Sequence, residues 1–498
     1  MPDILKIHPS DNVVVAIRSM NANEQPSADD LSLRLQDEIP AGHKIAIRQI
    51  NKGEQILKYG HSIGYATQNI APGSWVHSHN LATALNDTLA YRYEPVTEER
   101  PPVTGEKPTF MGYRRANGKV GTRNEVWIIN TVGCVNRSAE RIATTCNANS
   151  SDRVFDGVHA FSHPYGCSQL GDDLINTQKV LAGLIRHPNA GGVLVIGLGC
   201  ENNQMDDLLK IAGDVDRSRM RYFNSQEVED EVESGVQLVG ELVEEMKQDQ
   251  REVCPVSDLV LAMKCGGSDA FSGVTANPLV GRLTDLIAGF NGTSILTEVP
   301  EMFGAEQQLM NRAKDQDTFE RIVKMINEFK EYFIRHGQPV YENPSPGNKE
   351  GGITTLEEKS LGAIQKGGQA MVEQVLDYGE AVHGPGLALL NAPGNDGVSC
   401  TAQVVSGATV LLFTTGRGTP LGFPVPTIKI ASNTPLATKK PNWIDFNAGT
   451  VLDGDASLDE LSQTLFETVI RVASGQEQTK NELNDYREIA IFKDGVTL

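Results

Sequence analysis

The chain is poor in cysteine and in positive charge, and it has no long apolar run. Seven cysteines among 498 residues are too few for a disulfide scaffold, and none of them form a CxxC pair, which argues against a zinc ribbon or a thioredoxin-like motif. No apolar stretch approaches the roughly 18 residues that indicate a membrane span. We therefore expect no membrane partner.

Positive charge is the scarcer sign, because 44 Lys and Arg stand against 64 Asp and Glu, which gives a formal net charge of -20. Such an acidic chain argues against a nucleic-acid or anionic-membrane surface. The first residues, "MPDILKIHPSDN", also lack the basic-then-apolar pattern of a signal peptide. We expect a cytoplasmic protein that binds no nucleic acid.

The length predicts about three domains. Residues 1–92 form a predicted β-rich module, because "NVVVAIRSM", "GHKIAIRQI" and "GSWVHSHNL" recur between Pro/Gly turns. Residues 93–110 mix prolines and charges without periodicity and are typical of a linker. From there, short apolar runs alternate with amphipathic stretches, which predicts two α/β domains with mainly parallel sheets, 111–250 and 251–498.

Two histidines in the β-rich module, His77 and His79, stand two residues apart. Side chains at i and i+2 of a strand project from the same face, so both imidazoles would point together, as two ligands of one metal ion do. The alternative is that they are two solvated histidines at a strand end.

Four of the seven cysteines share one local context, an apolar run followed by a Gly-containing turn and a predicted helix start. The positive end of a helix dipole favours thiolate, and thiolates bind iron. The alternative is that each cysteine is a small residue filling a tight turn. Cys146, Cys254 and Cys400 lack this context and are read as structural. The four cysteines at predicted strand ends are Cys134, Cys167, Cys200 and Cys265.

Other predicted strand ends carry groups suited to acid–base chemistry and carboxylate binding. Arg417 stands in a Gly-rich turn suited to a carboxylate. "GLGCEN" resembles a dinucleotide fingerprint, but Asn202 replaces its third glycine, so nicotinamide binding is not the leading hypothesis. The further candidates at these ends are Glu298, Asn395, Asp396 and His163.

The chain resembles the altronate/galactarate dehydratase family along essentially its whole length. The carrying motifs include "YRRANGKVGTRNEVWIINTVGCVN", "FSHPYGCSQLGDD", "KCGGSDAFSGVTANPLVGR", "YENPSPGNKEGGITTLEEKSLG" and "TTGRGTPLGFPVPTIKI". The resemblance implies an N-terminal SAF (β-clip) domain followed by two Rossmann-like α/β domains. It also implies that water is removed from a sugar acid, with ferrous iron required, to give a 2-keto-3-deoxy acid.

The resemblance favours the altronate branch, whose product is 2-dehydro-3-deoxygluconate in hexuronate catabolism, with galactarate as the alternative substrate. Within it we expect His77 and His79 to bind iron, facing the cysteine-bearing edge of the next domain. His43 and Lys44 are the expected base and carboxylate clamp, unless they lie in a solvated surface turn. His163 is the expected acid, unless it is a core histidine bonded to backbone.

A second hypothesis places the iron in an iron–sulfur cluster held by three of the four strand-end cysteines. A homodimer is the expected assembly. Two further classes remain open, a non-catalytic carbohydrate-binding scaffold and a nicotinamide-dependent sugar-acid oxidoreductase. Turnover of altronate with iron and without nucleotide separates these classes from a dehydratase.

Overall fold

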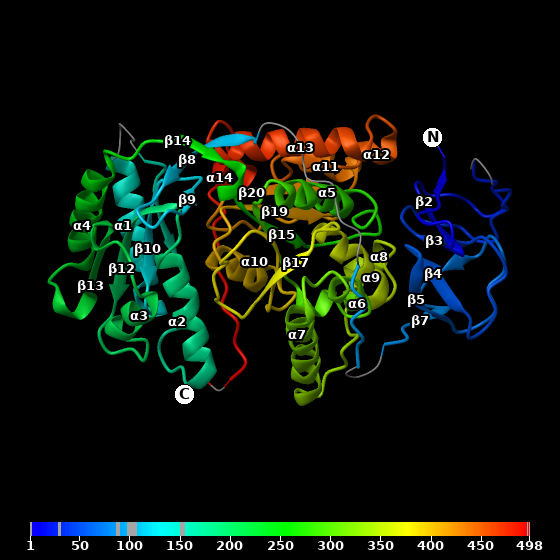
Figure 1. Ribbon diagram of the computed structural model, residues 1–498, viewed down its shortest axis with the longest axis horizontal. Coiled ribbons are helices and arrows are strands. Elements are labelled where there is room, and N and C mark those ends of the chain that lie inside the picture. The colour runs from blue at the N-terminus through cyan, green and yellow to red at the C-terminus, as the bar shows by residue number, and fades with distance from the viewer. Residues whose placement is uncertain are drawn as a thin grey trace.

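The computed structural model describes residues 2–27, 31–85, 90–96, 107–149, 155–495 and 497. Three parts follow one another along the long axis of the molecule (Figure 1). The N-terminal module lies at one end, the α/β domain that follows it in sequence lies at the other, and the C-terminal domain lies between them. No helix in the described ranges is long and apolar enough to cross a membrane.

The N-terminal module is all-β, as predicted, and consists of two antiparallel sheets ordered β1-β2-β3-β6 and β4-β5-β7. Its strands are short because turn residues interrupt every apolar run. They are β1 (Ile4–Leu5), β2 (Val13–Ala16), β3 (Lys44–Ala46), β4 (Gln55–Lys58), β5 (His61–Ala66), β6 (Trp75–Val76) and β7 (Leu81–Ala82).

The second part contains a parallel sheet of order β11-β10-β12-β13 between helices. Its two central strands are buried at every residue except the first of the longer one, as expected for strands covered on both faces. The strands are β10 (Glu125–Asn130), β11 (Val158–Phe161), β12 (Ala190–Gly197) and β13 (Met220–Asn224), and the helices are α1 (Asn136–Asn149), α2 (Gly171–Ile185), α3 (Met205–Ala212) and α4 (Glu231–Met246).

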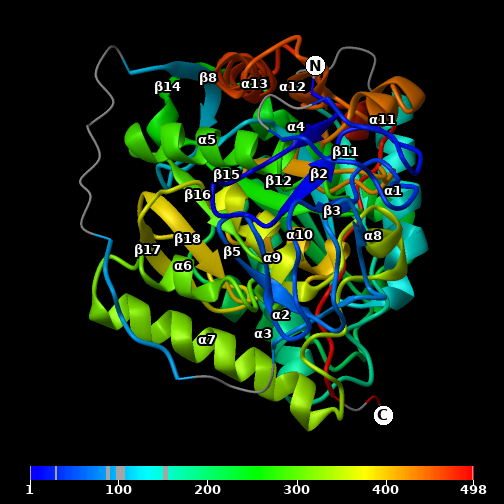
Figure 2. The same cartoon turned by 90° about the vertical axis from the view of Figure 1, so that its right-hand side faces the viewer.

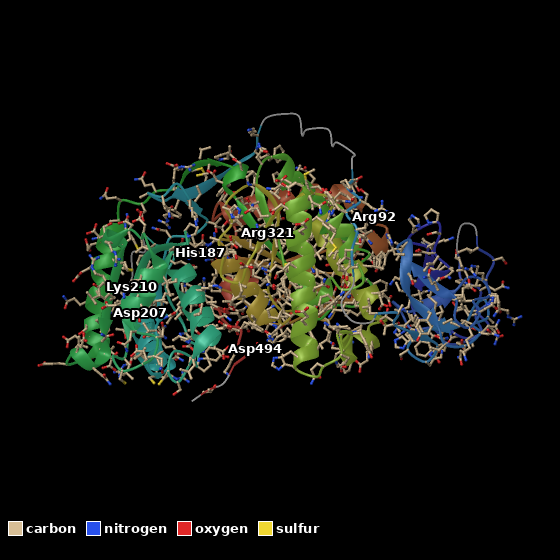
Figure 3. The ribbon with its side chains drawn as sticks, turned by 60° about the horizontal axis from the view of Figure 1, so that its bottom comes forward. Arg92, His187, Asp207, Lys210, Arg321 and Asp494 are labelled. Carbon is tan, nitrogen blue, oxygen red and sulfur yellow. The ribbon has the colours of Figure 1, made fainter. Side chains whose placement is uncertain are left out.

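A small antiparallel sheet joins the two α/β parts, because a strand from the start of the second part pairs with one from the start of the C-terminal domain. It contains β8 (Thr109–Arg114), β9 (Val120–Gly121) and β14 (Glu252–Pro255). His187, labelled in Figure 3, marks the contact with the C-terminal domain, where its ring bonds to the carbonyl of Ala408 at 3.0 Å. Of the predicted linker 93–110, residues 97–106 lie outside the described residues.

The C-terminal domain is built on a seven-stranded parallel sheet of order β17-β18-β16-β15-β19-β20-β21. The strands are β15 (Val260–Cys265), β16 (Thr293–Leu296), β17 (Val372–Leu376), β18 (Gly386–Leu390), β19 (Val410–Thr415), β20 (Thr427–Ala431) and β21 (Phe446–Asn447). The helices are α5 (Ala276–Gly289), α6 (Glu306–Met310), α7 (Gln316–Arg335), α8 (Pro346–Glu350), α9 (Leu356–Ala363), α10 (Asp396–Val405), α11 (Thr434–Lys439), α12 (Thr450–Asp453), α13 (Leu458–Ala473) and α14 (Lys480–Leu483).

The N-terminal module packs against the C-terminal domain, where it lies in front of α8 and α9 when viewed end-on (Figure 2). The expectation that it faces the cysteine-bearing edge of the second part is wrong, because the C-terminal domain separates the two (Figure 1). The two hypotheses about iron therefore refer to different parts of the molecule. The histidines lie in the N-terminal module, whereas three of the four cysteines lie in the second part and Cys265 lies in the C-terminal domain.

Candidate active site

Charged side chains gather at the carboxyl edge of the C-terminal sheet. Lys264 is the penultimate residue of β15, Glu298 follows β16, and Asp396 follows β18 at the start of α10. In parallel sheets these strand ends meet at one edge. The order of strands also reverses here, since the chain runs from β15 outward through β16 and later returns to β19 on the other side. Ligands of α/β proteins bind at such a switch point.

Lys264 is fully buried and holds this edge together. Its Nζ donates to Glu298 Oε1 at 2.5 Å and to the Gly394 carbonyl at 3.0 Å, and it lies 3.1 Å from Asp396 Oδ1. Gly266 makes the approach of Asp396 feasible, because a Cβ there would stand 2.6 Å from Asp396 Oδ2. Two of the carboxylates predicted from sequence are thus brought together by one lysine.

Glu298 occupies a strained position between two ammonium groups. Its backbone is left-handed, with φ 70°, a conformation that non-glycine residues rarely adopt outside functional sites. The second ammonium is that of Lys366, whose Nζ donates to Glu298 Oε2 at 2.8 Å. Burial alone raises the pKa of Glu298, but Lys264 and Lys366 outweigh burial and hold that pKa below its ordinary value. Glu298 is therefore a fixed carboxylate.

A second acid–base pair lies beside this cluster. Glu301 Oε1 is 3.0 Å from the Nζ of Lys359, and Gly394 lies next to the same carboxylate. The other oxygen, Glu301 Oε2, is buried and has no hydrogen-bond partner within the described part of the chain. A buried carboxylate oxygen without a donor is costly, so its retention points to a role in binding or proton transfer.

The interface with the N-terminal module contains a buried charge trio. Lys44 donates from Nζ to Glu358 at 2.8 Å, to the Gly352 carbonyl at 2.7 Å and to Thr354 Oγ1 at 2.7 Å. Lys58 donates to the other oxygen of Glu358 at 2.7 Å. All three charged side chains are at most 1% exposed.

The trio shifts the pKa of each member. Burial alone raises the pKa of Glu358, but Lys44 and Lys58 outweigh burial and bring it to about 2. Burial lowers the pKa of Lys44 to about 8, whereas at Lys58 the attraction of Glu358 outweighs burial and raises the pKa. The two lysines differ because one carboxylate neutralises only one ammonium. The uncompensated positive charge therefore favours the neutral form of Lys44.

His43 and His77 are both engaged with the segment around α8. His43 Nδ1 accepts a hydrogen bond from Trp75 Nε1 at 3.1 Å, so Nε2 carries the proton and donates to the Glu350 carbonyl at 3.2 Å. His77 Nε2 donates to the Lys349 carbonyl at 2.9 Å. The predicted base and clamp roles of His43 and Lys44 do not fit this geometry, because both ring nitrogens of His43 are already hydrogen-bonded and the Lys44 ammonium is bonded to the C-terminal domain.

The strand geometry expected for His77 and His79 is wrong. Strand β6 ends at Val76, and the two histidines lie in the turn that follows it. Asn80 closes that turn, because its Oδ1 accepts from the His77 N–H at 2.9 Å. His79 is exposed beside Trp75, and no three His, Cys, Asp or Glu side chains in the described ranges are close enough to hold a metal ion.

Three other predicted residues are placed as follows. His163 is buried, with Nε2 bonded to the Asn130 carbonyl at 2.8 Å and Nδ1 to the Tyr165 N–H at 3.2 Å, so neither ring nitrogen is free for the predicted acid role. Asn395 caps α10 through its Oδ1. Arg417 is exposed and lies 3.2 Å from Glu350 on α8, at the open side of the charged edge.

The four strand-end cysteines are divided between two sheets. Cys134, Cys167 and Cys200 follow β10, β11 and β12 and are exposed, whereas Cys265 is the last residue of β15 and is buried against Ser268. Of the exposed three, Cys134 lies within a short 3-10 turn directly before α1, while the other two precede their helices by four residues or more. Cys146, Cys254 and Cys400 are buried, as expected.

Sequence reasoning missed the lysines of the site. Lys264 had a usable signal, because it is the single charge in the apolar run "LVLAMKC". Lys359 and Lys366 follow the long "YENPSPGNKEGG" loop and carry no local signal, since each meets its carboxylate only through the fold.

Comparisons with known proteins match all three parts. The SAF domain of altronate/galactarate dehydratases matches residues 2–84, the second domain of D-galactarate dehydratase/altronate hydrolase matches residues 112–247, and the C-terminal domain of D-galactarate/altronate dehydratase matches residues 256–497.

Three curated relatives extend over nearly the full chain. The altronate dehydratase of Bacillus subtilis (strain 168) is 50% identical over 100% of both chains, and that of Escherichia coli (strain K12) is 50% identical over 99% of both. The galactarate dehydratase (L-threo-forming) of Escherichia coli (strain K12) is 36% identical over 98% of this chain and 96% of its own. The chain belongs to the D-galactarate/altronate dehydratase family and is a hydro-lyase.

Proposed function

We propose that the chain converts D-altronate to 2-dehydro-3-deoxy-D-gluconate, a step of hexuronate catabolism, at the carboxyl edge of the C-terminal sheet. The observation that carries this proposal is the buried Lys264, which holds Glu298 and Asp396 at a strand-order switch point. The choice of altronate is supported by two relatives of that name at 50% identity, against 36% for the galactarate dehydratase.

The chemistry requires positive charge near the substrate carboxylate. Loss of water from a 2,3-dihydroxy acid removes the proton at C2 and expels the hydroxyl at C3, and the resulting enol becomes the 2-keto acid. Negative charge builds on the carboxylate as the C2 proton leaves, and fixed cations stabilise it without reorganising. Lys264 and Lys366 are such cations, since Glu298 holds both in place.

We assign proton removal at C2 to Glu301. Its Oε2 is buried and has no donor within the described residues, while Lys359 fixes the carboxylate through Oε1. A base with one oxygen anchored and one free is oriented for proton transfer. Asp396, which is partly exposed next to Lys264, faces the open side and is suited to bind a substrate hydroxyl.

Arg417 is the proposed carboxylate anchor. Its guanidinium pairs with Glu350, and both side chains are largely exposed, with 48% and 69% of their side-chain surface accessible. An exposed ion pair contributes little to stability, so exchange of Glu350 for a substrate carboxylate costs little. Substrate binding by Asn395 stays a prediction. Its Oδ1 is already occupied, because it caps a helix.

Ferrous iron remains a proposal, and it would supply a Lewis acid to the carboxylate and an adjacent hydroxyl. The pair His77 and His79 does not fit an iron site as it stands, because His77 is bonded through both ring nitrogens and His79 faces solvent. We assign no step to iron at these histidines. Cytoplasmic location, a homodimer and the Rossmann-like character of both α/β parts are likewise proposals.

A substrate panel tests the proposed function. The purified protein is incubated anaerobically with ferrous iron and either D-altronate or galactarate, without nucleotide, and the 2-keto-3-deoxy acid is measured. We expect kcat/KM for altronate to exceed that for galactarate at least about tenfold, a difference of about 1.4 kcal/mol. Preference for galactarate, or turnover only after NAD is added, contradicts the proposal.

A further inference from the structure

A cavity of about 540 Å³ lies in the second part of the chain, and no residue of the charged edge of the C-terminal sheet lines it. It lies where β12 and β13 begin, between the hairpin that joins β8 to β9 and the end of α2. Its volume falls within the range of about 300–1,000 Å³ that is usual for small-molecule sites. The proposed dehydration chemistry does not use this cavity.

Cations outnumber carboxylates in the cavity, although the chain as a whole has a formal net charge of -20. A concave site lined by one sign of charge attracts ligands of the opposite sign. The cavity therefore favours an anion. The cations that line it are Arg114, Arg115, Lys119, Arg186 and Arg219, and the carboxylates are Asp214, Asp216 and Asp249.

Three of the arginines are already paired with carboxylates. Arg219 donates to both oxygens of Asp249, at 2.7 and 2.9 Å, and Arg115 lies 3.5 Å from the same group. Arg114 pairs with Glu252, which does not line the cavity, at 2.6 Å. These three arginines are bound into the structure of the wall.

Lys119 and Arg186 have no carboxylate partner among the described residues. Arg186 donates only from Nη1, to the carbonyls of Ile211 and Ala212 at the end of α3, so within the same residues its Nε and Nη2 have no acceptor. A solvated surface lysine is the alternative for Lys119, but burial and then the charge of Arg186 both lower its pKa. The two cations are thus close enough to repel each other, and an anion between them relieves that repulsion.

His187 lies in the wall of the cavity and connects it to the C-terminal domain (Figure 3). Its Nε2 donates to the Ala408 carbonyl at 3.0 Å, and its Nδ1 accepts from the Asn189 N–H at 3.1 Å. Burial is the main cause that lowers the pKa of His187 to about 3, and Lys119 and Arg115 add to it. The ring is therefore neutral at pH 7, and the positive charge of the cavity comes from its lysine and arginines.

We propose that this cavity binds a small phosphorylated molecule, with the phosphate between Lys119 and Arg186 and hydroxyls of the ligand directed to Asp214. A phosphate monoester carries about 1.5 to 2 negative charges at neutral pH, which matches two unpaired cations better than the single charge of an aldonate does. The free Nε and Nη2 of Arg186 form a fork suited to two phosphate oxygens, and Lys119 supplies a point charge for a third. Asp214 is exposed in the lining and can accept from a hydroxyl.

Isothermal titration calorimetry of the full chain tests this at low ionic strength, where attraction between charges is least screened. Glucose 6-phosphate is the probe, and inorganic phosphate and glucose are separate arms. We expect glucose 6-phosphate to bind, inorganic phosphate to bind more weakly, and glucose not to bind.

Lys119→Gln and Arg186→Gln should each weaken binding of glucose 6-phosphate at least about tenfold, because each removes a charge-assisted contact. The matched control is Lys210→Gln, which removes an exposed lysine of α3 that does not line the cavity and should change the affinity less than about twofold. Arg417→Ala should leave binding intact, which separates this site from the edge of the C-terminal sheet. Binding is measured without turnover, so the result does not depend on the proposed dehydration.

Binding that glucose equals, or that survives both Lys119→Gln and Arg186→Gln, overturns the proposal. So does the absence of binding by glucose 6-phosphate at millimolar concentration, even if inorganic phosphate alone binds. Loss of binding in Arg417→Ala also overturns it, because the phosphate would then lie at the C-terminal sheet. Circular dichroism checks the fold of each variant, and Lys119→Gln decides the matter if Arg186→Gln, which also loses its bonds to α3, does not fold.

Discussion

Glu358 is the residue on which attachment of the N-terminal module depends most. Replacing it with glutamine removes the charge that Lys44 and Lys58 share. The amide of glutamine also cannot satisfy all the donors that surround this carboxylate. One oxygen of Glu358 accepts from Lys44 and from the Thr354 N–H, the other from Lys58 and Lys44. Either orientation of glutamine therefore places an NH2 group against donors.

The magnitude follows from the carboxyl pKa. A fall from 4.5 to about 2 corresponds to about 3 kcal/mol at neutral pH, within the 3–5 kcal/mol typical of breaking a buried ion pair. Because the folded-state pKa of Glu358 is depressed, this stabilisation is fully present above pH 4.5 and is lost as the pH falls toward 2. Glu358→Gln should abolish that acid-dependent loss.

Hydrogen exchange of the Ala84 amide, which donates to Glu357 across the same interface at 2.7 Å, measures the effect locally, which suits a chain of several domains better than one melting curve. A cost of about 3 kcal/mol predicts roughly 150-fold faster exchange when the module detaches. The matched control is Glu54→Gln, which breaks the more solvent-accessible Arg48–Glu54 pair and should leave the exchange rate nearly unchanged. A change below about threefold in Glu358→Gln would refute the reasoning.

Two further predictions concern the acid–base edge. Glu301→Gln should lower kcat by about 10² to 10⁴, while its amide oxygen can still accept from Lys359 and circular dichroism checks that the fold is retained. Unchanged kcat would remove Glu301 as the base. Arg417→Ala should raise KM for altronate about tenfold or more with a smaller effect on kcat, and Arg417→Lys should restore only part of the loss, because lysine cannot bind a carboxylate bidentately; steady-state kinetics checks both.

The fold was largely predictable because the two α/β parts have continuous apolar strands. The run "GGVLVIG" is buried on both faces in β12, which leaves little ambiguity between strand and turn. Glu298 and Asp396 were accessible to the same reasoning, since polar residues directly after such runs lie at a sheet edge. Lys366 was not, because it reaches Glu298 from a segment 68 residues further along the chain.

The strand geometry predicted for His77 and His79 is wrong for a local reason. Period-two alternation in "WVHSHN" predicts that both imidazoles project from one face of a strand, but the strand stops after two residues. Asn80 fixes the turn from both sides, accepting from the His77 N–H and donating from Nδ2 to the Trp75 carbonyl at 2.8 Å. Asparagine is a frequent turn residue for this reason, and it was the signal against a continuing strand.

The N-terminal module holds one segment of the C-terminal domain in place. His43, Lys44 and His77 all donate to backbone carbonyls of residues 349–352, the segment that carries Glu350 opposite Arg417. Three donors from one rigid β module fix that segment, and with it the open side of the charged edge. Removing one donor should loosen the segment without removing a reacting group.

His77→Ala separates this positioning role from iron binding. If His77 positions the α8 segment, the variant keeps the iron content of the wild type, kcat/KM falls about tenfold, and His77→Gln recovers part of the loss because its amide can donate to the Lys349 carbonyl. If His77 is an iron ligand, iron is lost and glutamine does not rescue it. Iron analysis beside steady-state kinetics on the two variants decides between the roles, and a loss of iron would contradict the positioning role argued from the hydrogen bond.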